Sequence, residues 1–257
     1  MEILQIDVGG KFAHFRKYYA NNTAMSFTLP PRTTLMGMLA GMLGRPRDQY
    51  YEEFASERIR IGIRVMNPVK KSFHRLNFLR VTGLNDFNGS KGRIQTPFEI
   101  VSGLDISRNE VVYRIYVACA VEGKQTFEEL KLAVLNRRNK YALTFGTANF
   151  NASILSAKLF GDAQIREIND GSRLVIHSSV PSEAVEELVF DRESADDRLQ
   201  FIEEELLPAD FLGNGNRELR LMNRIVFSTT GHGIEVRLNR PYYEIEDDGI
   251  QRIIFLE

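Results

Sequence analysis

Cysteine is almost absent from this sequence of 257 residues. Cys119 is the single cysteine, so no disulfide can form within the chain and no cysteine cluster can hold a metal ion. Four histidines are present, at positions 14, 74, 177 and 232, and they lack the spacing of metal ligands on a helix. We therefore expect no metal site and no cofactor.

Long hydrophobic runs are missing as well. No apolar stretch approaches the roughly 20 residues that span a membrane. The first residues, Met1 to Ile6, lack the pattern of a signal peptide. The sequence predicts no membrane partner and a cytoplasmic location.

A net charge of one sign is also missing, but the charges are unevenly distributed. The formal net charge is −1. Residues 1–141 hold 22 Lys and Arg against 13 Asp and Glu, a net of +9, whereas residues 142–257 hold 11 against 21, a net of −10. This pattern favours a basic face for a polyanion and an acidic part that repels it or contacts another protein. A chance dipole in a soluble protein is the plain alternative.

The hydrophobic pattern predicts alternating strands and helices in the first 160 residues. Period-two alternation indicates strands at 2–8, 58–65, 111–121 and 153–160. Leucines and methionines at helical spacing predict a helix at 33–44, which Gly44 ends. A capping box at Thr126–Glu129 opens a second helix. The even positions of the strand at 58–65 carry a row of arginines, which faces either a ligand or solvent: Arg58, Arg60 and Arg64.

The helix at 33–44 contains more glycine than a stable helix needs. Gly37 and Gly41 each cost about 1 kcal/mol relative to alanine. Close approach of this helix to a sheet would offset that cost.

Residues 70–106 differ from their surroundings. They are rich in Lys, Arg, Asn and Gly, and their strand-like flanks enclose Asn88–Gly92. This predicts a protruding β-hairpin with a mobile tip. Its candidate RNA contacts are Arg75, Arg80, Lys91 and Arg93.

The predicted order is β–α–β, a hairpin, and β–α–β again, which is the ferredoxin-like or RNA-recognition-motif (RRM) arrangement of an α+β protein. We expect one domain over 1–160, including the thumb hairpin 70–106. A β-rich acidic C-terminal part, 161–257, packs on it. Its predicted strands lie near 174–178, 219–227, 234–238, 242–246 and 250–256, with an acidic helix around 195–206.

Two neighbouring segments carry groups that bind nucleic acid. Residues 15–19 are basic and aromatic, and residues 29–39 open a helix. Cations contact phosphates, aromatic rings stack on bases, and the N–H groups at a helix start bind phosphate. The candidate contacts are Arg16, Lys17, Tyr18, Tyr19, Arg32, Thr33 and Thr34.

These segments also carry a family resemblance. Residues 12–19, FAHFRKYY, followed by residues 29–39, LPPRTTLMGML, resemble the N-terminal signature of the Cas-five family of CRISPR-associated proteins, in the RAMP superfamily. The sequence is most similar to the branch found in type I-B effector complexes. Residues 141–148, YALTFGTA, resemble the family's second glycine element, although Ala148 and Asn149 depart from the Ser-Glu common in relatives.

The resemblance implies a modified RRM domain with a thumb-like hairpin. It implies a non-catalytic subunit of a type I Cascade surveillance complex that binds the 5′ handle of CRISPR RNA (crRNA) in antiviral defence. The implied partners are the backbone subunit (Cas-seven), the large subunit (Cas-eight) and, through the complex, target DNA. Gly146 and Thr147 become candidate RNA contacts on the same ground.

Other functions remain open at this point. One branch of the family resembles metal-independent endoribonucleases that process precursor crRNA with Tyr, His and Lys, and His14, Lys17 and Tyr18 could supply those groups. RNA binding or packing is the simpler interpretation of these residues, so we expect no enzyme. A stand-alone single-stranded nucleic-acid binder fits the basic features equally well. A protein-binding scaffold is a third possibility.

Overall fold

The computed structural model describes residues 1–20, 23–189 and 201–257. Within them the chain is mostly β-strand with two α-helices, α1 (Arg32–Leu43) and α2 (Lys124–Leu135). The architecture is α+β at this level, as the sequence predicted.

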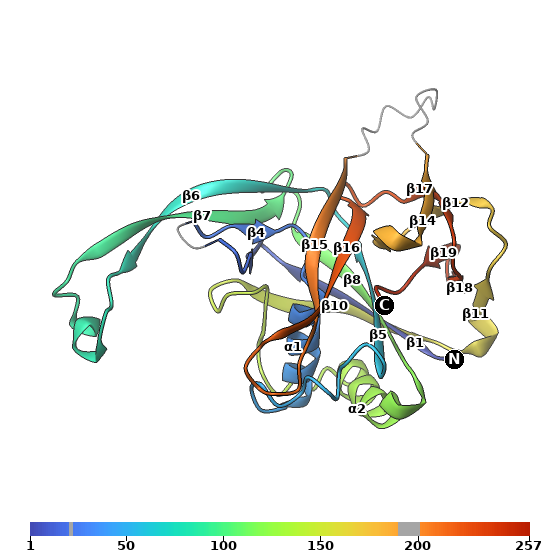
Figure 1. Cartoon of the computed structure of the whole chain (residues 1–257), viewed down its shortest axis with the longest axis horizontal. Coiled ribbons are helices and arrows are strands. Elements are labelled where there is room, and N and C mark those ends of the chain that lie inside the picture. Colours follow the sequence, from blue (N-terminus) through green and yellow to red (C-terminus); the bar gives the residue numbers. More distant parts are fainter. Residues whose placement is uncertain (21–22, 190–200) are drawn as a thin grey trace.

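A central five-stranded sheet organises the first part of the chain (Figure 1). Its strand order is β5-β8-β1-β10-β9, and every pair of neighbours is antiparallel. The strands are β1 (Ile3–Gly10), β5 (Ile59–Val65), β8 (Val111–Cys119), β9 (Leu143–Thr144) and β10 (Asn151–Phe160).

The two faces of this sheet are covered differently. Leu4 and Ile6 of β1 share one core with Leu39 of α1 and Leu130 of α2, so both helices cover one face. On the opposite face, Tyr116 packs with residues of the C-terminal strands, including Tyr243. Alternation along each strand explains this, because successive side chains point to opposite faces of a sheet.

The C-terminal strands form three further sheets. Their orders are β11-β18-β19, β12-β17-β14 and β13-β16-β15. The strands are β11 (Ile165–Ile168), β12 (Arg173–Ile176), β13 (Val180–Pro181), β14 (Val185–Leu188), β15 (Ile202–Phe211), β16 (Leu219–Ser228), β17 (Ile234–Leu238), β18 (Tyr242–Glu246) and β19 (Ile250–Ile253). Short 3₁₀ turns lie at Val121–Gly123, Asp162–Gln164 and Ser182–Ala184.

The predicted hairpin is present and extends well away from the body (Figure 1). We call β6 (Val69–Leu79), its antiparallel partner β7 (Arg93–Gly103) and the segment between them the thumb. A 3₁₀ helix, η1 (Leu84–Asn88), forms its tip. The buried Asp86 carboxylate accepts hydrogen bonds from the backbone N–H groups of Thr82 and Gly83, so local contacts organise the tip.

Three short strands connect β1 with α1. β2 (Phe12–Ala13) pairs with the thumb strand β7, whereas β3 (Phe15–Arg16) pairs with β4 (Ser26–Phe27). The basic aromatic segment therefore lies at the root of the thumb.

Two local predictions are wrong. Residues 202–206 of the expected acidic helix form strand β15, and residues 195–200 lie outside the described part. Pairing with β16 and ion pairs to Glu205 override the helix preference of glutamate. Thr126 does not cap α2 either: the helix starts at Lys124, and the Thr126 hydroxyl donates to Glu53 instead.

No helix within the described ranges is long and apolar enough to cross a membrane.

Candidate nucleic-acid interface

Two tyrosines stand exposed at the turn after β3. Tyr18 and Tyr19 are each 56% exposed, and their rings meet edge to face with centroids 5.1 Å apart. Arg16, the last residue of β3 and two residues before Tyr18, is also exposed. This aromatic corner offers ring faces and a cation to a ligand.

Lysines beside this corner are already paired with carboxylates. The Lys17 Nζ lies 3.3 Å from a Glu205 oxygen, and the Lys71 Nζ lies 3.2 Å from the same oxygen. Burial lowers the pKa of the Lys17 ammonium, but the charge and hydrogen bond of Glu205 outweigh it, so the pKa lies above its usual value. The root of the thumb is thus a place where basic and acidic halves of the chain meet.

Strand β15 is fixed to the N-terminal segment by its glutamates. The Thr28 N–H donates to Glu205 Oε2, and the Thr28 hydroxyl donates to Glu203 Oε2, both at 2.9 Å. Because Glu205 also pairs with Lys17 and Lys71, part of the charge asymmetry between the two halves of the sequence is neutralised inside the molecule.

The basic residues of the thumb lie in different surroundings. Register places Arg93 opposite Leu79, and the pleat puts Leu79 on the same face as Arg75, so the two exposed arginines share one face. Arg80, also exposed, follows the end of β6 at the tip. Lys91 lies 3.1 Å from the Asp86 carboxylate and stabilises the tip.

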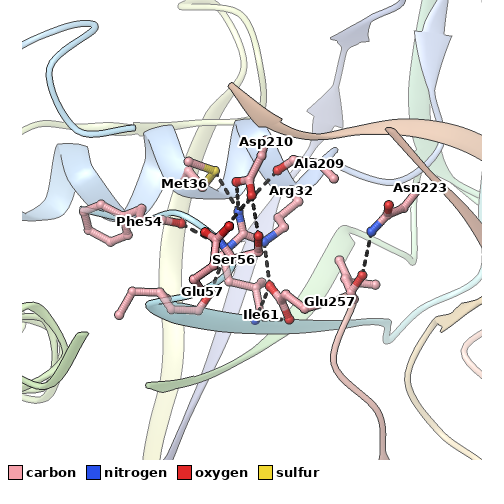
Figure 2. Close-up of polar contacts among 12 residues, drawn as sticks. Arg32, Met36, Phe54, Ser56, Glu57, Ile61, Ala209, Asp210, Asn223 and Glu257 are labelled. Carbon is pink, nitrogen blue, oxygen red and sulfur yellow. Dashed lines mark hydrogen bonds and ion pairs between the residues drawn. The ribbon is translucent and has the colours of Figure 1, made fainter. Parts of the chain in front are cut away.

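Arg32 corrects an expectation. Its side chain is 2% exposed, and its guanidinium contacts Asp210 at 2.6 Å and Glu257 at 2.5 Å (Figure 2). It also donates to the carbonyl oxygens of Phe54 and Ile59. A guanidinium so enclosed cannot meet a phosphate.

The Arg32 network joins four parts of the chain (Figure 2). The second oxygen of Asp210 accepts from the Ser56 hydroxyl and from Arg220. The Glu257 carboxylate accepts from the Ile61 N–H at 3.1 Å. Arg32 therefore connects the start of α1 with β5, β15 and the last residues of the sequence.

The start of α1 is closed to ligands for the same reason. Thr33 is 7% exposed, and the Thr34 N–H donates to Pro31 O at 2.8 Å. Among the three predicted contacts here, only Thr34 is half-buried and lines an open hollow. The expected phosphate site at Arg32 and Thr33 is not formed.

That hollow is a groove between α1 and β9. Its volume is about 210 Å³, and Thr34, Gly37, Gly41 and Gly146 contribute to its walls. A Cβ on Gly41 would meet no heavy atom within 4 Å. The expected close approach of α1 to a sheet therefore does not explain Gly41.

Gly146 has a different reason to be glycine. Its φ of +89° lies in the left-handed region, and a Cβ there would overlap the carbonyl oxygen of His14. Gly146 brings the second glycine element against the basic aromatic segment. Thr147 follows it in a turn. The carbonyl oxygen of Thr147 accepts a hydrogen bond from the Phe150 N–H at 3.0 Å.

The groove continues into a second hollow of about 370 Å³. Ala142 and Leu143 line both, and the second is flanked by Arg137, Lys140 and Tyr141. Sequence reasoning missed these residues, because cations after α2 suit a helix C-terminus by the dipole alone. The nearby glycine element was the signal that could have identified them.

His14, the base of the alternative cleavage mechanism, is enclosed. It is 2% exposed, its Nδ1 lies 2.7 Å from Glu99 O, and its ring centroid lies 4.0 Å from that of Phe98. Burial lowers the pKa of the His14 imidazole. Lys17 and Tyr18 follow it in sequence, but only Tyr18 is exposed.

The arginine row of β5 lies under the C-terminal strands. Arg60 donates to the Tyr243 hydroxyl at 3.2 Å, and Arg64 donates to Gly231 O at 2.9 Å. Arg58 precedes β5 and is exposed. The row therefore does not form a continuous surface for a strand of nucleic acid.

Comparison with known proteins gives a family match over most of the sequence. The family model described as CRISPR-associated protein (Cas_Cas5) matches residues 3–201. A search of curated proteins found no match.

Two solved structures share the fold. The crystal structure of a CRISPR protein from Archaeoglobus fulgidus is 15% identical, with a TM-score of 0.58 and 100% of each chain covered. A chain of a CRISPR RNA-guided surveillance complex is 13% identical, with a TM-score of 0.51 and 91% of each chain covered.

Proposed function

Because the chain belongs to the Cas-five family of CRISPR-associated proteins, we propose that it is a non-catalytic subunit of a type I Cascade surveillance complex, of the I-B kind. It binds the 5′ handle of crRNA and caps the backbone in antiviral defence. Its partners are the backbone subunit (Cas-seven) and the large subunit (Cas-eight), and it meets target DNA through the complex in the cytoplasm.

The observation that carries this proposal is the aromatic corner at the root of the thumb. Tyr18 and Tyr19 are each 56% exposed, so both rings are accessible to a ligand. Exposed ring faces beside Arg16 suit the bases and phosphates of a single strand. Arg75 and Arg93 share one face of the thumb and add two exposed cations to the proposed RNA path.

The fold supports a ferredoxin-like, modified RRM classification. Four strands follow the order β10-β1-β8-β5 with antiparallel neighbours, and both helices lie on one face. The C-terminal strands cover part of the face that RRM proteins use for RNA. We therefore place the RNA at the thumb root and the groove beside α1 rather than across the sheet.

We also propose that the chain has two parts, residues 1–160 and residues 161–257. The main core includes Leu207 and Leu256 together with residues of β1 and α1. Because the two parts share this core, they fold as one cooperative unit, and truncation after residue 160 destabilises the first part.

The proposal includes binding without cleavage. A general base must reach the ribose 2′-hydroxyl. His14 is buried, and its Nδ1 is engaged by Glu99 O. We expect no metal-independent cut when the purified protein is incubated with labelled repeat RNA in chelator. A site-specific cut that is lost in a His14→Ala protein would establish the ribonuclease instead.

Co-expression with the neighbouring subunits tests the binding function. We expect a complex that retains one class of short RNA with a uniform 5′ end, found by sequencing the bound RNA. Recovery of the chain alone with heterogeneous RNA would favour a stand-alone binder, and recovery of a protein complex without RNA would favour a scaffold.

A further inference from the structure

Strand β6 of the thumb presents a different set of side chains on each of its faces. Its pairing with β7 runs from Val69 to Leu79 in an unbroken register, so successive residues alternate between the two faces throughout. One face carries Lys71, Phe73 and Arg75 in succession. The Phe73 side chain is 58% exposed, and Arg75 is also exposed, so this face is open.

The opposite face of the thumb is apolar and packs on the protein at its root. Phe78 lies on this face, and its ring centroid is 5.9 Å from that of Phe98. The Phe98 ring in turn lies 6.3 Å from that of Phe150, and Phe98 and Ile100 are each 8% exposed. A ligand that follows the thumb from its root therefore meets the face that carries lysine and arginine.

A carboxylate lies opposite Phe73 but leaves its ring accessible. The register pairs Phe73 with Glu99 of β7. Glu99 is 7% exposed, and its Oε2 accepts a hydrogen bond from the Ser26 N–H at 2.7 Å. The Glu99 carboxylate is therefore held at the root of the thumb, and the Phe73 ring stays open to a ligand beside Arg75.

The aromatic corner adjoins this open face. Lys17, which directly precedes the two exposed tyrosines, lies 3.3 Å from one oxygen of Glu205. Lys71, on the open face of the thumb, lies 3.2 Å from the same oxygen. The corner and the thumb thus meet at a single carboxylate, and Phe73 is the next residue after Lys71 on that face. Exposed rings and cations therefore continue from the corner onto the thumb.

We propose that Phe73 stacks on one unpaired base of the RNA, with phosphate contacts at Lys71 and Arg75 on either side of it. This inference rests on the proposed function and adds a third ring to the two of the aromatic corner. Alternate residues of a strand stand about 7 Å apart, so both cations are within reach of the phosphates that flank a stacked nucleotide. A ring face between cations is the combination with which proteins hold single strands.

The surroundings of Phe73 favour RNA over a protein partner. Its neighbours along and across the strands of this face are charged: Lys71, Arg75 and Glu99. The centre of a protein–protein interface is depleted of charged residues, whereas a phosphate chain needs cations beside each base contact. The RNA therefore leaves the aromatic corner along one face of the thumb.

The chain contains no tryptophan, which allows a direct test. Phe73→Trp places a single indole at the stacking position, and Phe78→Trp places a matched one on the opposite face of the same strand. Titration with unlabelled repeat RNA should quench the emission of Phe73→Trp, because stacking puts a base against the indole. The emission of Phe78→Trp should stay unchanged. Unquenched emission of Phe73→Trp at RNA concentrations that saturate the chain would overturn the inference.

Fluorescence anisotropy with labelled repeat RNA gives a second readout. Phe73→Leu keeps an apolar side chain but loses the planar face, and it should bind about 5- to 150-fold more weakly than wild type. Phe78→Leu is the control and should bind as wild type does. Equal affinity of Phe73→Leu and wild type would show that the RNA passes elsewhere and would leave the proposed function in place.

Two further outcomes separate this inference from the function on which it rests. Quenching of Phe73→Trp by the neighbouring subunits in the absence of RNA would assign Phe73 to a protein interface and overturn the stacking role. A wild-type chain that binds no repeat RNA, alone or in its complex, would refute the proposed function and the stacking role together.

Discussion

The Lys17 ammonium lies 3.3 Å from the Glu205 carboxylate, across 188 positions of sequence. The same carboxylate oxygen lies 3.2 Å from Lys71 at the root of the thumb. An acidic side chain of β15 therefore holds two cations that stand beside the exposed tyrosines. In the proposed function this carboxylate competes with RNA phosphate for the two lysines.

Glu205→Gln should tighten RNA binding, because Lys17 and Lys71 lose their anionic partner. The glutamine oxygen can still accept from the Thr28 N–H, so the strand contact is kept. We expect about a two- to tenfold gain in affinity at low salt, which shrinks as salt rises. Filter binding of repeat RNA over a salt series measures it. Glu204→Gln is the control, since Glu204 is exposed and pairs with Arg224 instead. An equal gain in both variants would indicate a net-charge effect only.

The rings of the aromatic corner should bind RNA by stacking on its bases. Tyr18→Leu and Tyr19→Leu should each weaken RNA binding by about 1–3 kcal/mol, because stacking on a base needs a planar face. Tyr18→Phe and Tyr19→Phe keep that face and should bind nearly as wild type does. Fluorescence anisotropy with a labelled single strand compares the four. Equal losses for Leu and Phe would assign the effect to the hydroxyls rather than to stacking.

Gly41 should keep the groove open. Gly41→Ala has space for its methyl group and should raise the free energy of unfolding by about 1 kcal/mol, because alanine favours helix. Gly41→Leu fills the groove, and we expect at least a tenfold loss of RNA affinity, about 1.4 kcal/mol. Chemical denaturation and RNA titration of the two variants separate the effects. Unchanged affinity in Gly41→Leu would remove the groove from the RNA path.

Arg32→Met should destabilise the fold and not act on RNA directly. The substitution leaves the Glu257 carboxylate buried without the Arg32 cation, and Asp210 keeps the Arg220 cation and the Ser56 hydrogen bonds. Breaking a buried ion network in this way costs about 3–5 kcal/mol. Urea denaturation measures the loss. A stable Arg32→Met protein with weakened RNA binding would restore Arg32 as a ligand contact.

Strand and helix patterns were readable from the sequence where one face is buried. Leu4, Ile6 and Val8 alternate because they pack beneath the sheet, and Gly44 ends α1 in the left-handed region at φ +74°. The strands predicted near 242–246 and 250–256 are present as β18 and β19, which pair with each other. Local periodicity carries this information.

Contacts between residues far apart in the sequence could not be predicted. Arg32 is followed by two threonines, a pattern that predicts a phosphate contact. Its guanidinium instead pairs with Asp210 and Glu257, which lie near the other end of the sequence, and no local pattern predicts those contacts. The glutamates of β15 favour helix locally, yet pairing with β16 makes them a strand. The cations Arg137 and Lys140 line a hollow only because the start of β10 lies beside them.

Acid should destabilise the protein through His177. The unfolded histidine has a pKa near 6.5, and the buried one near 4, so between these values the unfolded chain binds more protons and stability falls as pH falls. The loss reaches up to about 3 kcal/mol by pH 4. His177→Asn keeps an acceptor for the Arg252 N–H and should flatten this window relative to wild type. An equal loss of stability in wild type and His177→Asn between pH 6.5 and 4 would contradict this role of His177.

Ultraviolet crosslinking of the complex purified with its own RNA tests directly whether this chain binds RNA at the root of the thumb. Mass spectrometry of the crosslinked peptides should place RNA on residues 16–19, on the thumb strands around Arg75 and Arg93, and on the segment 137–147. Crosslinks confined to α2 or the C-terminal strands, or absent from this chain while its partner subunits carry them, would show that RNA does not bind at the root of the thumb.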